Sequence, residues 1–328
     1  MSVGFICRII SFALGLLIAA LQGYAREEAY PNRPIRLVST SAPGGSSDAI
    51  ARTVVQQIEN ATGWNFVVDN RAGAAGIIGY GIAARAAPDG YTVLHATAAL
   101  VINPSIYRKL PYDVHRDFTP ITSLGSAYGY LVIVNASVPA RSLKELIALA
   151  RNKDTRLLYG SPGVGNTLHL AGATFNERAG TQLVHVPYKG VALVFNALIS
   201  GEIQVLFSPP AAILQHVQSG KVRALAFTGP ARWEGLPDVP TVAEAAIPGF
   251  DISGSWHGWF AAGKTPGTIV DKLHHAIRAA IFTPKLRDFL KASGYEPDGR
   301  PPVEFRRFIA VEVKRYADEV RKAGVEPQ

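Results

Sequence analysis

Residues 35–50, IRLVSTSAPGGSSDAI, combine a strand pattern, a glycine-rich loop and the start of a helix. Ile35 to Thr40 is apolar enough for a buried strand, and Ile50, Val54 and Ile58 recur four residues apart, on one helical face. A strand that passes through a glycine loop into a helix is the building unit of α/β domains. This stretch therefore predicts an α/β fold.

A second such unit lies in the other half of the chain. Residues 160–172, GSPGVGNTLHLAG, follow the expected strand Leu157 to Tyr159 and lead into a helical stripe. Gly160, Gly165 and Thr167 have the spacing of a phosphate-binding P-loop, but Asn166 stands where that loop has its lysine. Without the lysine and a magnesium-binding carboxylate, nucleotide hydrolysis is disfavoured.

Strand and helix patterns alternate along most of the chain, and a long amphipathic helix closes it, with apolar residues from Phe305 to Val320 at a helical period. Further strands are expected at 66–68, 91–96, 131–134, 183–186, 203–207 and 222–227, and helices near 77–87, at 143–151 and at 209–218. No long Pro/Ser-rich linker interrupts this pattern, so two domains, if present, are joined by strands.

The two glycine loops are candidate anion sites. Ligands of open α/β sheets bind beyond the carboxyl ends of strands, where backbone N–H groups and the helix dipole favour negative charge. One such loop alone is most simply a helix cap. Two loops, one from each half, indicate a cleft in which each loop holds one end of a small anion, and such sites suit carboxylates as well as phosphates.

The first 25 residues predict a cleaved export signal. Arg8 is their only charged residue, an apolar run extends from Ile9 to Leu21, and small residues precede a cleavage point near Ala25. Since Cys7 is the only cysteine, the mature protein has none, which excludes disulfides, cysteine nucleophiles and thiolate metal sites. A periplasmic protein without cofactor or metal is the expectation.

The net charge of +8 does not indicate nucleic-acid binding, because basic residues are scattered and not clustered with aromatic ones. No G-x-S-x-G or H-E-x-x-H motif is present, and no paired carboxylates stand out, so an enzyme is not expected. A hydrolase using Ser161 and His169 remains an alternative, but no third group completes it.

The whole of the expected mature chain resembles the periplasmic solute-binding proteins of tripartite tricarboxylate transporters, known as Bug receptors. Besides the two loops, the resemblance rests on the order and spacing of PNRPIRLV (31–38), VVDNRAGAAGIIG (67–79), ARAAPDGYTVL (84–94), VPYKG (186–190), SGKVRALAFTG (219–229) and LPDVPTVAEA (236–245). Each string alone is weak evidence, whereas the ordered set is specific.

This resemblance implies a type II periplasmic binding protein fold, with two domains of mixed sheet flanked by helices and a ligand cleft between them. The expected boundaries are 1–25 for the signal, 26–126 with 249–328 for domain 1, and 127–248 for domain 2. It also implies a monomer that closes on a small carboxylate and delivers it to a membrane transporter. A receptor that presents its closed form to a membrane sensor is the alternative.

The candidate ligand contacts come from the two loops, from the segment after the third strand that the resemblance adds, and from the later strands. They are Ala42, Pro43, Gly44, Gly45, Ser46, Asp48, Ala96, Thr97, Ala98, Ser161, Gly163, Gly165, Asn166, Thr167, His169, Tyr188, Phe207 and Ser208. Asp48 is better placed to cap its helix than to touch ligand. His169 is equally consistent with a donor or a surface residue.

Several positions depart from the family pattern. Acidic residues that the family commonly keeps appear as Ala197, Gln204 and Ser208. The cleft is therefore expected to be less acidic than usual. That favours plain mono- or dicarboxylates over ligands that carry an ammonium group.

Overall fold

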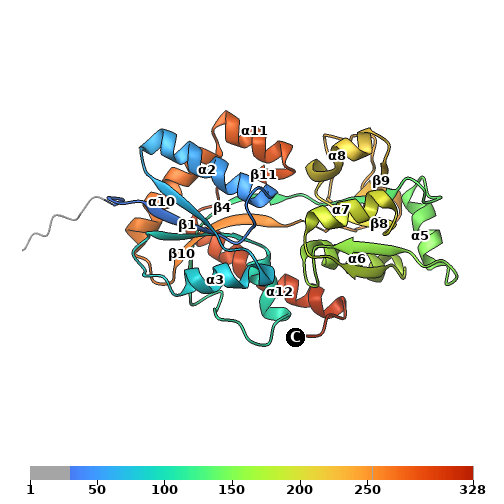
Figure 1. Cartoon of the computed structure of the whole chain (residues 1–328), viewed down its shortest axis with the longest axis horizontal. Helices are drawn as coiled ribbons and strands as arrows, with labels where there is room; N and C mark the ends of the chain where they lie inside the picture. The colour runs from blue at the N-terminus through green and yellow to red at the C-terminus, as the bar shows by residue number, and fades with distance from the viewer. Residues whose placement is uncertain (1–29, 253, 328) are drawn as a thin grey trace, which may run out of the picture.

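The computed structural model describes residues 30–252 and 254–327, so the predicted export signal lies outside the described residues. Two groups of elements lie side by side, each with a β-sheet flanked by helices (Figure 1). The predicted α/β fold with two mixed sheets is confirmed.

The first group holds a six-stranded sheet. Its strands are β1 (Ile35–Ser39), β2 (Phe66–Asn70), β3 (Thr92–Thr97), β4 (Phe118–Ala127), β10 (Trp256–Ala262) and β11 (Tyr295–Pro297), in the spatial order β11-β4-β10-β3-β1-β2. The strand β1 pairs in parallel with β2 and β3, while β10 runs antiparallel to β3 and β4. The flanking helices are α2 (Ser46–Thr62), α3 (Ile77–Ala84), α4 (Ala99–Ile102), α10 (Gly267–Ile281), α11 (Pro284–Ala292) and α12 (Pro302–Lys322), with short 3-10 turns η1 (Ala74–Gly76) and η2 (Asn103–Ser105).

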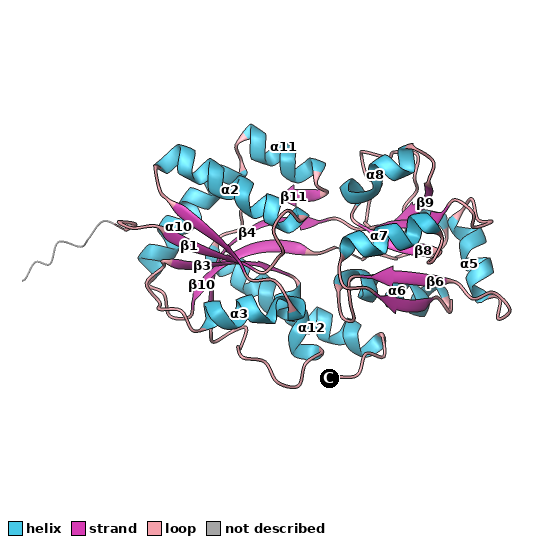
Figure 2. Ribbon diagram, viewed as in Figure 1, coloured by secondary structure: helices cyan, strands magenta, loops and turns pink. Residues whose placement is uncertain are grey.

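The second group holds a five-stranded sheet in the order β7-β6-β8-β5-β9. Its strands are β5 (Leu131–Asn135), β6 (Leu158–Ser161), β7 (Val184–Pro187), β8 (Val205–Ser208) and β9 (Val222–Phe227). Here β6 is parallel to β7 and β8, and β5 is antiparallel to β8 and β9. Its helices are α5 (Leu143–Arg151), α6 (Thr167–Ala179), α7 (Val191–Ser200), α8 (Pro210–Gln218) and α9 (Val242–Ala245) (Figure 2).

Central strands of both sheets are buried on both faces. The two-residue period of a strand sends neighbouring side chains to opposite sides, into different apolar clusters. Val132 and Val134 of β5 pack into one apolar cluster, whereas Leu131 and Ile133 of the same strand pack into another. Such strands read as continuous apolar runs in the sequence, which is why most of them were predicted. The strand β4 was missed: it contains Pro120, which lies opposite a register shift in β10.

The chain crosses between the two groups twice, once between β4 and β5 and once between β9 and β10. The buried hydroxyl of Thr228 is one of the groups that tie these two crossings together. The Thr228 Oγ1 atom accepts a hydrogen bond from the Tyr130 backbone N–H at 2.8 Å and donates to the Ile252 carbonyl at 3.1 Å. Backbone bonds from Thr228 N to Tyr130 O and from Ile252 N to Thr228 O reinforce the link.

The closing helix α12 packs along the first sheet and also contacts α6 of the second group. Leu170 of α6 belongs to the same apolar cluster as Phe305 and Tyr316 of α12. The two groups therefore share a packed contact in addition to the two crossings. None of the helices in the described part of the chain is long and apolar enough to span a membrane.

Replacing Thr228 with valine keeps the shape of the side chain but leaves the Tyr130 N–H and the Ile252 carbonyl without this partner. We expect Thr228→Val to lower the free energy of unfolding by about 1–3 kcal/mol, the cost of an unsatisfied buried polar group, as measured by urea denaturation. Thr228→Ser, which keeps the hydroxyl, is the matched control. A valine variant no less stable than the serine variant would contradict the role of this hydroxyl.

Candidate ligand site

The loop after β1 and the loop after β6 meet at a cavity of about 360 Å³ between the two groups. Its polar lining consists of Ser46, Ser47, Thr97, Tyr130, Asn166, Thr167, Ser255, His257, Ser293 and Tyr295. Its apolar lining consists of Ala99, Ile102, Pro162, Leu168, Val191, Pro209, Ala211 and Ala212. No Asp, Glu, Lys or Arg is among these residues.

The first loop brings the N-terminus of α2 to the cavity. Gly45 is the N-cap of this helix, so Ser46 and Ser47 occupy its first turn, where backbone N–H groups have no intrahelical acceptor. Gly44 has a φ of +78°, a left-handed conformation that glycine adopts without strain. The loop thus presents two hydroxyls and unpaired N–H groups at the positive end of a helix dipole.

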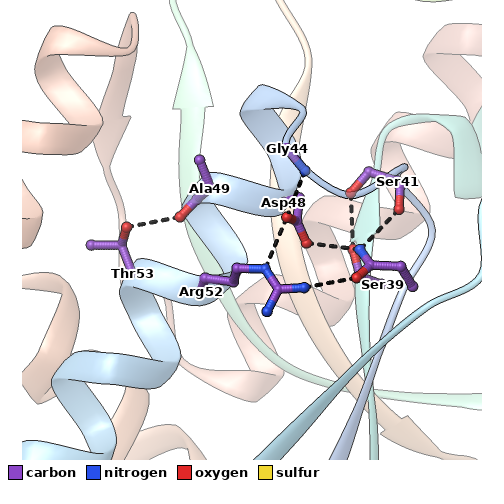
Figure 3. Close-up of polar contacts among 8 residues, drawn as sticks. Ser39, Ser41, Gly44, Asp48, Ala49, Arg52 and Thr53 are labelled. Carbon is purple, nitrogen blue, oxygen red and sulfur yellow. Dashed lines mark hydrogen bonds and ion pairs between the residues drawn. The ribbon is translucent and has the colours of Figure 1, made fainter.

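Asp48 holds this loop in place from behind. Its Oδ2 atom accepts hydrogen bonds from Gly44 N at 3.0 Å and Arg52 Nε at 2.9 Å, and its Oδ1 atom accepts one from Asn70 at 2.7 Å (Figure 3). Burial acts to raise the pKa of Asp48, but the bonds from Arg52, Asn70 and Gly44 outweigh it and lower the pKa. Both carboxylate oxygens are engaged, which fits the expected structural role and leaves neither directed at the cavity.

The second loop presents the N-terminus of α6. Asn166 is the N-cap, and its Oδ1 atom accepts a hydrogen bond from Leu168 N at 3.0 Å, so the residue at the P-loop lysine position caps the helix. Gly165 has a φ of +75°, and a Cβ added there would run into Ile106, which follows η2 in the first group. The two groups therefore touch beside the cavity, and Gly165 permits this close approach.

A pair of histidines lies behind the first loop. His95 of β3 and His257 of β10 face each other, with His95 Nε2 at 3.2 Å from His257 Nδ1 and at 3.1 Å from Ser47 Oγ. Burial lowers the pKa of His95 to about 4. Burial, together with the neighbouring His95, lowers the pKa of His257 as well. Both rings are therefore neutral near pH 7.

A second pair lies behind the second loop. His169 of α6 stacks on His185 of β7 with ring centroids 3.9 Å apart, and burial lowers the pKa of His169 to about 4 and of His185 to about 3. Gly165 N donates to His169 Nδ1 at 3.0 Å. His169 is buried, so the surface interpretation was wrong, and its Nδ1 atom holds the loop.

Ser161 is not arranged for hydrolysis with His169. Its hydroxyl donates to the Gly163 carbonyl at 2.8 Å and lies 2.7 Å from His185 Nε2, and its side chain is fully buried. Because the hydroxyl proton goes to a carbonyl, His185 is the donor in the second contact. Within residues 30–252 and 254–327, no carboxylate bonds His185 to complete a triad.

The remaining predicted contacts are distributed as follows. Four of them line the cavity: Ser46, Thr97, Asn166 and Thr167. Ala42, Pro43, Gly44, Gly45, Gly163 and Gly165 shape the two loops without lining the cavity, and Ala96, Ala98 and Phe207 are buried in apolar clusters. The Tyr188 hydroxyl donates to Glu202 at 2.8 Å, and the Ser208 hydroxyl to the Pro209 carbonyl at 3.1 Å.

Sequence reasoning missed more than half of the lining. Tyr130 and Ser255 come from the two crossings, Ser293 from the turn after α11, Tyr295 from the start of β11, and Ala212 from α8. None of these segments has the glycine pattern that marks the two loops. The only sequence signal near them is the stretch SWHGW at 255–259, from which packing by the tryptophans was expected.

A larger cavity of about 460 Å³ lies nearby and shares Tyr295 with the first. Its lining includes Trp233 and two residues of each charge, Arg232, Lys291, Glu234 and Glu296. Arg232 is paired with Glu244, and Lys291 lies 3.8 Å from Glu296. We place the ligand in the smaller cavity, because only there do two helix N-termini converge.

Two sheets joined by paired crossings, with loops from both meeting at a cavity, define the class of two-lobed solute-binding proteins. Residues 50–325 match the family model described as the tripartite tricarboxylate transporter family receptor. The chain belongs to this family, as its sequence motifs predicted.

Individual relatives agree with this assignment. The Protein BugT of Bordetella pertussis is 31% identical over 315 residues, which cover 95% of this chain and 96% of the relative. Among solved structures, R. palustris Rpa4515 with adipate is 32% identical and superposes with a TM-score of 0.84 over 91% of this chain and 100% of that one. MatC from Rhodopseudomonas palustris with bound malate is 27% identical, with a TM-score of 0.78 over 89% and 100% of the two chains.

The Gly165–Ile106 contact predicts that Gly165→Ala is more destabilising than an alanine at another left-handed glycine. Gly180 (φ +60°) is the matched control, since a Cβ there meets nothing closer than 3.9 Å. We expect about 1 kcal/mol of strain at both sites, and a further 1–3 kcal/mol of overpacking at Gly165 only. Urea denaturation measures both. Adding Ile106→Ala to G165A should recover part of the overpacking cost. Equal decreases in the free energy of unfolding of G165A and G180A would contradict the contact between Gly165 and Ile106.

The histidines with depressed pKa values predict a loss of stability on acidification. Because their pKa values are depressed in the folded protein, the unfolded chain binds protons first as the pH falls below about 6.5. Stability contributed by neutral His95, His169 and His185 is complete above that pH and is lost toward pH 4, by up to about 1.4 kcal/mol per pH unit for each. Urea denaturation from pH 7.5 to 4.5 measures this slope, which His169→Gln should make shallower. An unchanged slope in that variant would contradict the assignment.

Proposed function

We propose that this protein captures a small carboxylate with an apolar body in the cavity between its two lobes and delivers it to a membrane transporter of the tripartite tricarboxylate type. The observation that carries the proposal is the convergence of two helix N-termini, with Ser46, Ser47, Asn166 and Thr167, on a cavity lined by no charged side chain.

The charge of the ligand follows from the donors. The first turns of α2 and α6 supply N–H groups and hydroxyls at the positive ends of two helix dipoles, an environment that favours anions. A hydrogen bond to a charged group contributes about 1.5–3 kcal/mol. Four to six such bonds, less the costs of closure, give dissociation constants on the order of micromolar. An ammonium group would find no carboxylate in this lining.

The body of the ligand follows from the apolar wall. Pro162, Val191, Ala211 and Ala212 line the cavity, and their side chains offer dispersion contact but no hydrogen bonds. A dicarboxylate with methylene or aromatic carbons between its two acid groups matches this pattern. The likeness to family members with bound adipate and malate supports a dicarboxylate, and the wall favours the less polar of the two.

Capture by closure is part of this proposal. We place domain 1 at residues 26–126 and 249–328 and domain 2 at 127–248, with the crossings near Tyr130 and Ser255 as the hinge. The protein acts outside the cytoplasm as a monomer after removal of residues 1–25. The lining by Tyr130 and Ser255 supports this arrangement, because hinge movement then alters the cavity directly.

A thermal-shift screen of the protein from residue 26 tests the function. The panel contains adipate, malate, citrate, benzoate, glutamate and ATP, and a ligand that binds the folded state raises the melting temperature. We expect the largest shift with an apolar dicarboxylate. A shift with ATP alone, or with no carboxylate, would overturn the proposal.

Thr167→Val removes one hydroxyl from the cavity and keeps the shape of the side chain. We expect the affinity for the best acid to fall by about tenfold, since one charge-assisted bond is lost, while Thr167→Ser stays near the unaltered protein. Isothermal titration calorimetry measures both. Equal binding by the valine and serine variants would show that this end of the cavity does not hold the carboxylate.

A further inference from the structure

A buried tryptophan fixes the protonation of the first histidine pair. Trp259 Nε1 donates a hydrogen bond to His95 Nδ1 at 2.9 Å, and both side chains are fully buried. An indole nitrogen only donates, so His95 Nδ1 must be the unprotonated nitrogen of a neutral ring. The proton of His95 therefore resides on Nε2.

Among the described residues, the Nε2–H of His95 has two hydrogen-bond partners, Ser47 and His257. Ser47 Oγ lies at 3.1 Å and His257 Nδ1 at 3.2 Å. When Ser47 accepts, its own hydroxyl proton is free to point elsewhere. When His257 Nδ1 accepts, the proton of neutral His257 resides on its Nε2 atom. In both cases the next residue has a donor to offer, and both residues line the cavity.

We propose that Trp259 is a positioning residue that, through His95, orients Ser47 and His257 as hydrogen-bond donors to a ligand carboxylate, with His257 as a ligand contact. Trp259 itself is absent from the cavity lining, so it acts only through the chain of bonds that begins at its N–H. The direction is the same at each step: Trp259 donates to His95, the single Nε2–H of His95 donates to Ser47 or to His257, and the residue that accepts it has its own proton to donate to the anion.

The surroundings of the pair favour neutral rings. Besides Trp259 and His257 from β10, His95 is near the carboxylate of Asp48, which is engaged by Arg52, Asn70 and Gly44. His257 packs edge-on against the Tyr295 ring at 4.7 Å. Neither ring has a carboxylate bonded to it within the described residues. The pair thus offers directed donors without a positive charge.

The inference rests on the proposed carboxylate binding, and the experiment separates the two. Trp259→Phe removes the indole N–H and keeps an aromatic ring against Phe66. Trp256→Phe is the matched control, because Trp256 lies on the same strand, is equally buried, and donates to Glu312 instead of a histidine. Long-range ¹H–¹⁵N NMR of the eight histidines reports the tautomer of His95 without any ligand.

We expect the Nε2–H tautomer of His95 in the unaltered protein and in W256F, and a tautomer mixture in W259F. The affinity for adipate, or for the tightest acid of the panel above, should fall at least fivefold in W259F and stay within twofold in W256F. An unchanged tautomer and affinity in W259F would overturn the inference while leaving the proposed function intact. Absence of carboxylate binding by the unaltered protein would overturn both.

A second pair of variants keeps the test valid if W259F folds poorly. His257→Gln retains a side-chain N–H donor, whereas His257→Phe has none and fills a similar volume. We expect H257Q to bind within about threefold of the unaltered protein and H257F to lose at least tenfold. Equal losses in the two variants would show that His257 contributes shape and not a hydrogen bond.

Discussion

The site depends on the double crossing of the chain between its two sheets. Each glycine loop is a local product of one strand and one helix, but neither encloses a cavity alone. The crossings, tied by the Thr228 hydroxyl, place the carboxyl ends of β1 and β6 opposite each other. They also contribute Tyr130 and Ser255 to the lining, so the connection between the lobes forms part of the cavity wall.

The electrostatic potential in the cavity arises from helix and side-chain dipoles, because no charged side chain lines it. Each lobe contributes a helix N-terminus, and each loop is backed by a pair of neutral histidines, the buried His95 with the buried His257 and the buried His169 with the half-buried His185. The nearest buried carboxylate, Asp48, is saturated by hydrogen bonds that hold the loop. These hydrogen bonds offset the repulsion between the Asp48 carboxylate and an anion in the cavity. No lysine or arginine is needed in the lining, where a cation without a bound ligand would lack a partner.

The sequence predicted what is local. Strand periodicity gave most of the strands, the glycine loops gave the lining residues Ser46, Asn166 and Thr167, and the family resemblance added Thr97 and the two mixed sheets. The sequence could not predict Ser293 or Tyr295, because a short turn after α11 carries no pattern that relates it to loops far away in the chain. Inward-facing members of the loops were also misjudged: Ser161 ends a buried strand and bonds to Gly163 and His185. Which side of a loop faces the cavity is decided by packing.

A receptor must release its ligand as well as bind it, and neutral donors suit both requirements. A buried charged side chain that pairs with a ligand loses its partner when the ligand leaves. Its charge then remains in a poorly solvated site, which is unfavourable. Under the proposed closure mechanism, hydroxyls and backbone N–H groups at the cavity wall bond to water when the lobes separate, so opening costs little at these positions. Under the proposed function, the apolar residues Val191, Ala211 and Ala212 select among acids by the carbon chain between the acid groups, because every carboxylate presents the same oxygens to the two loops.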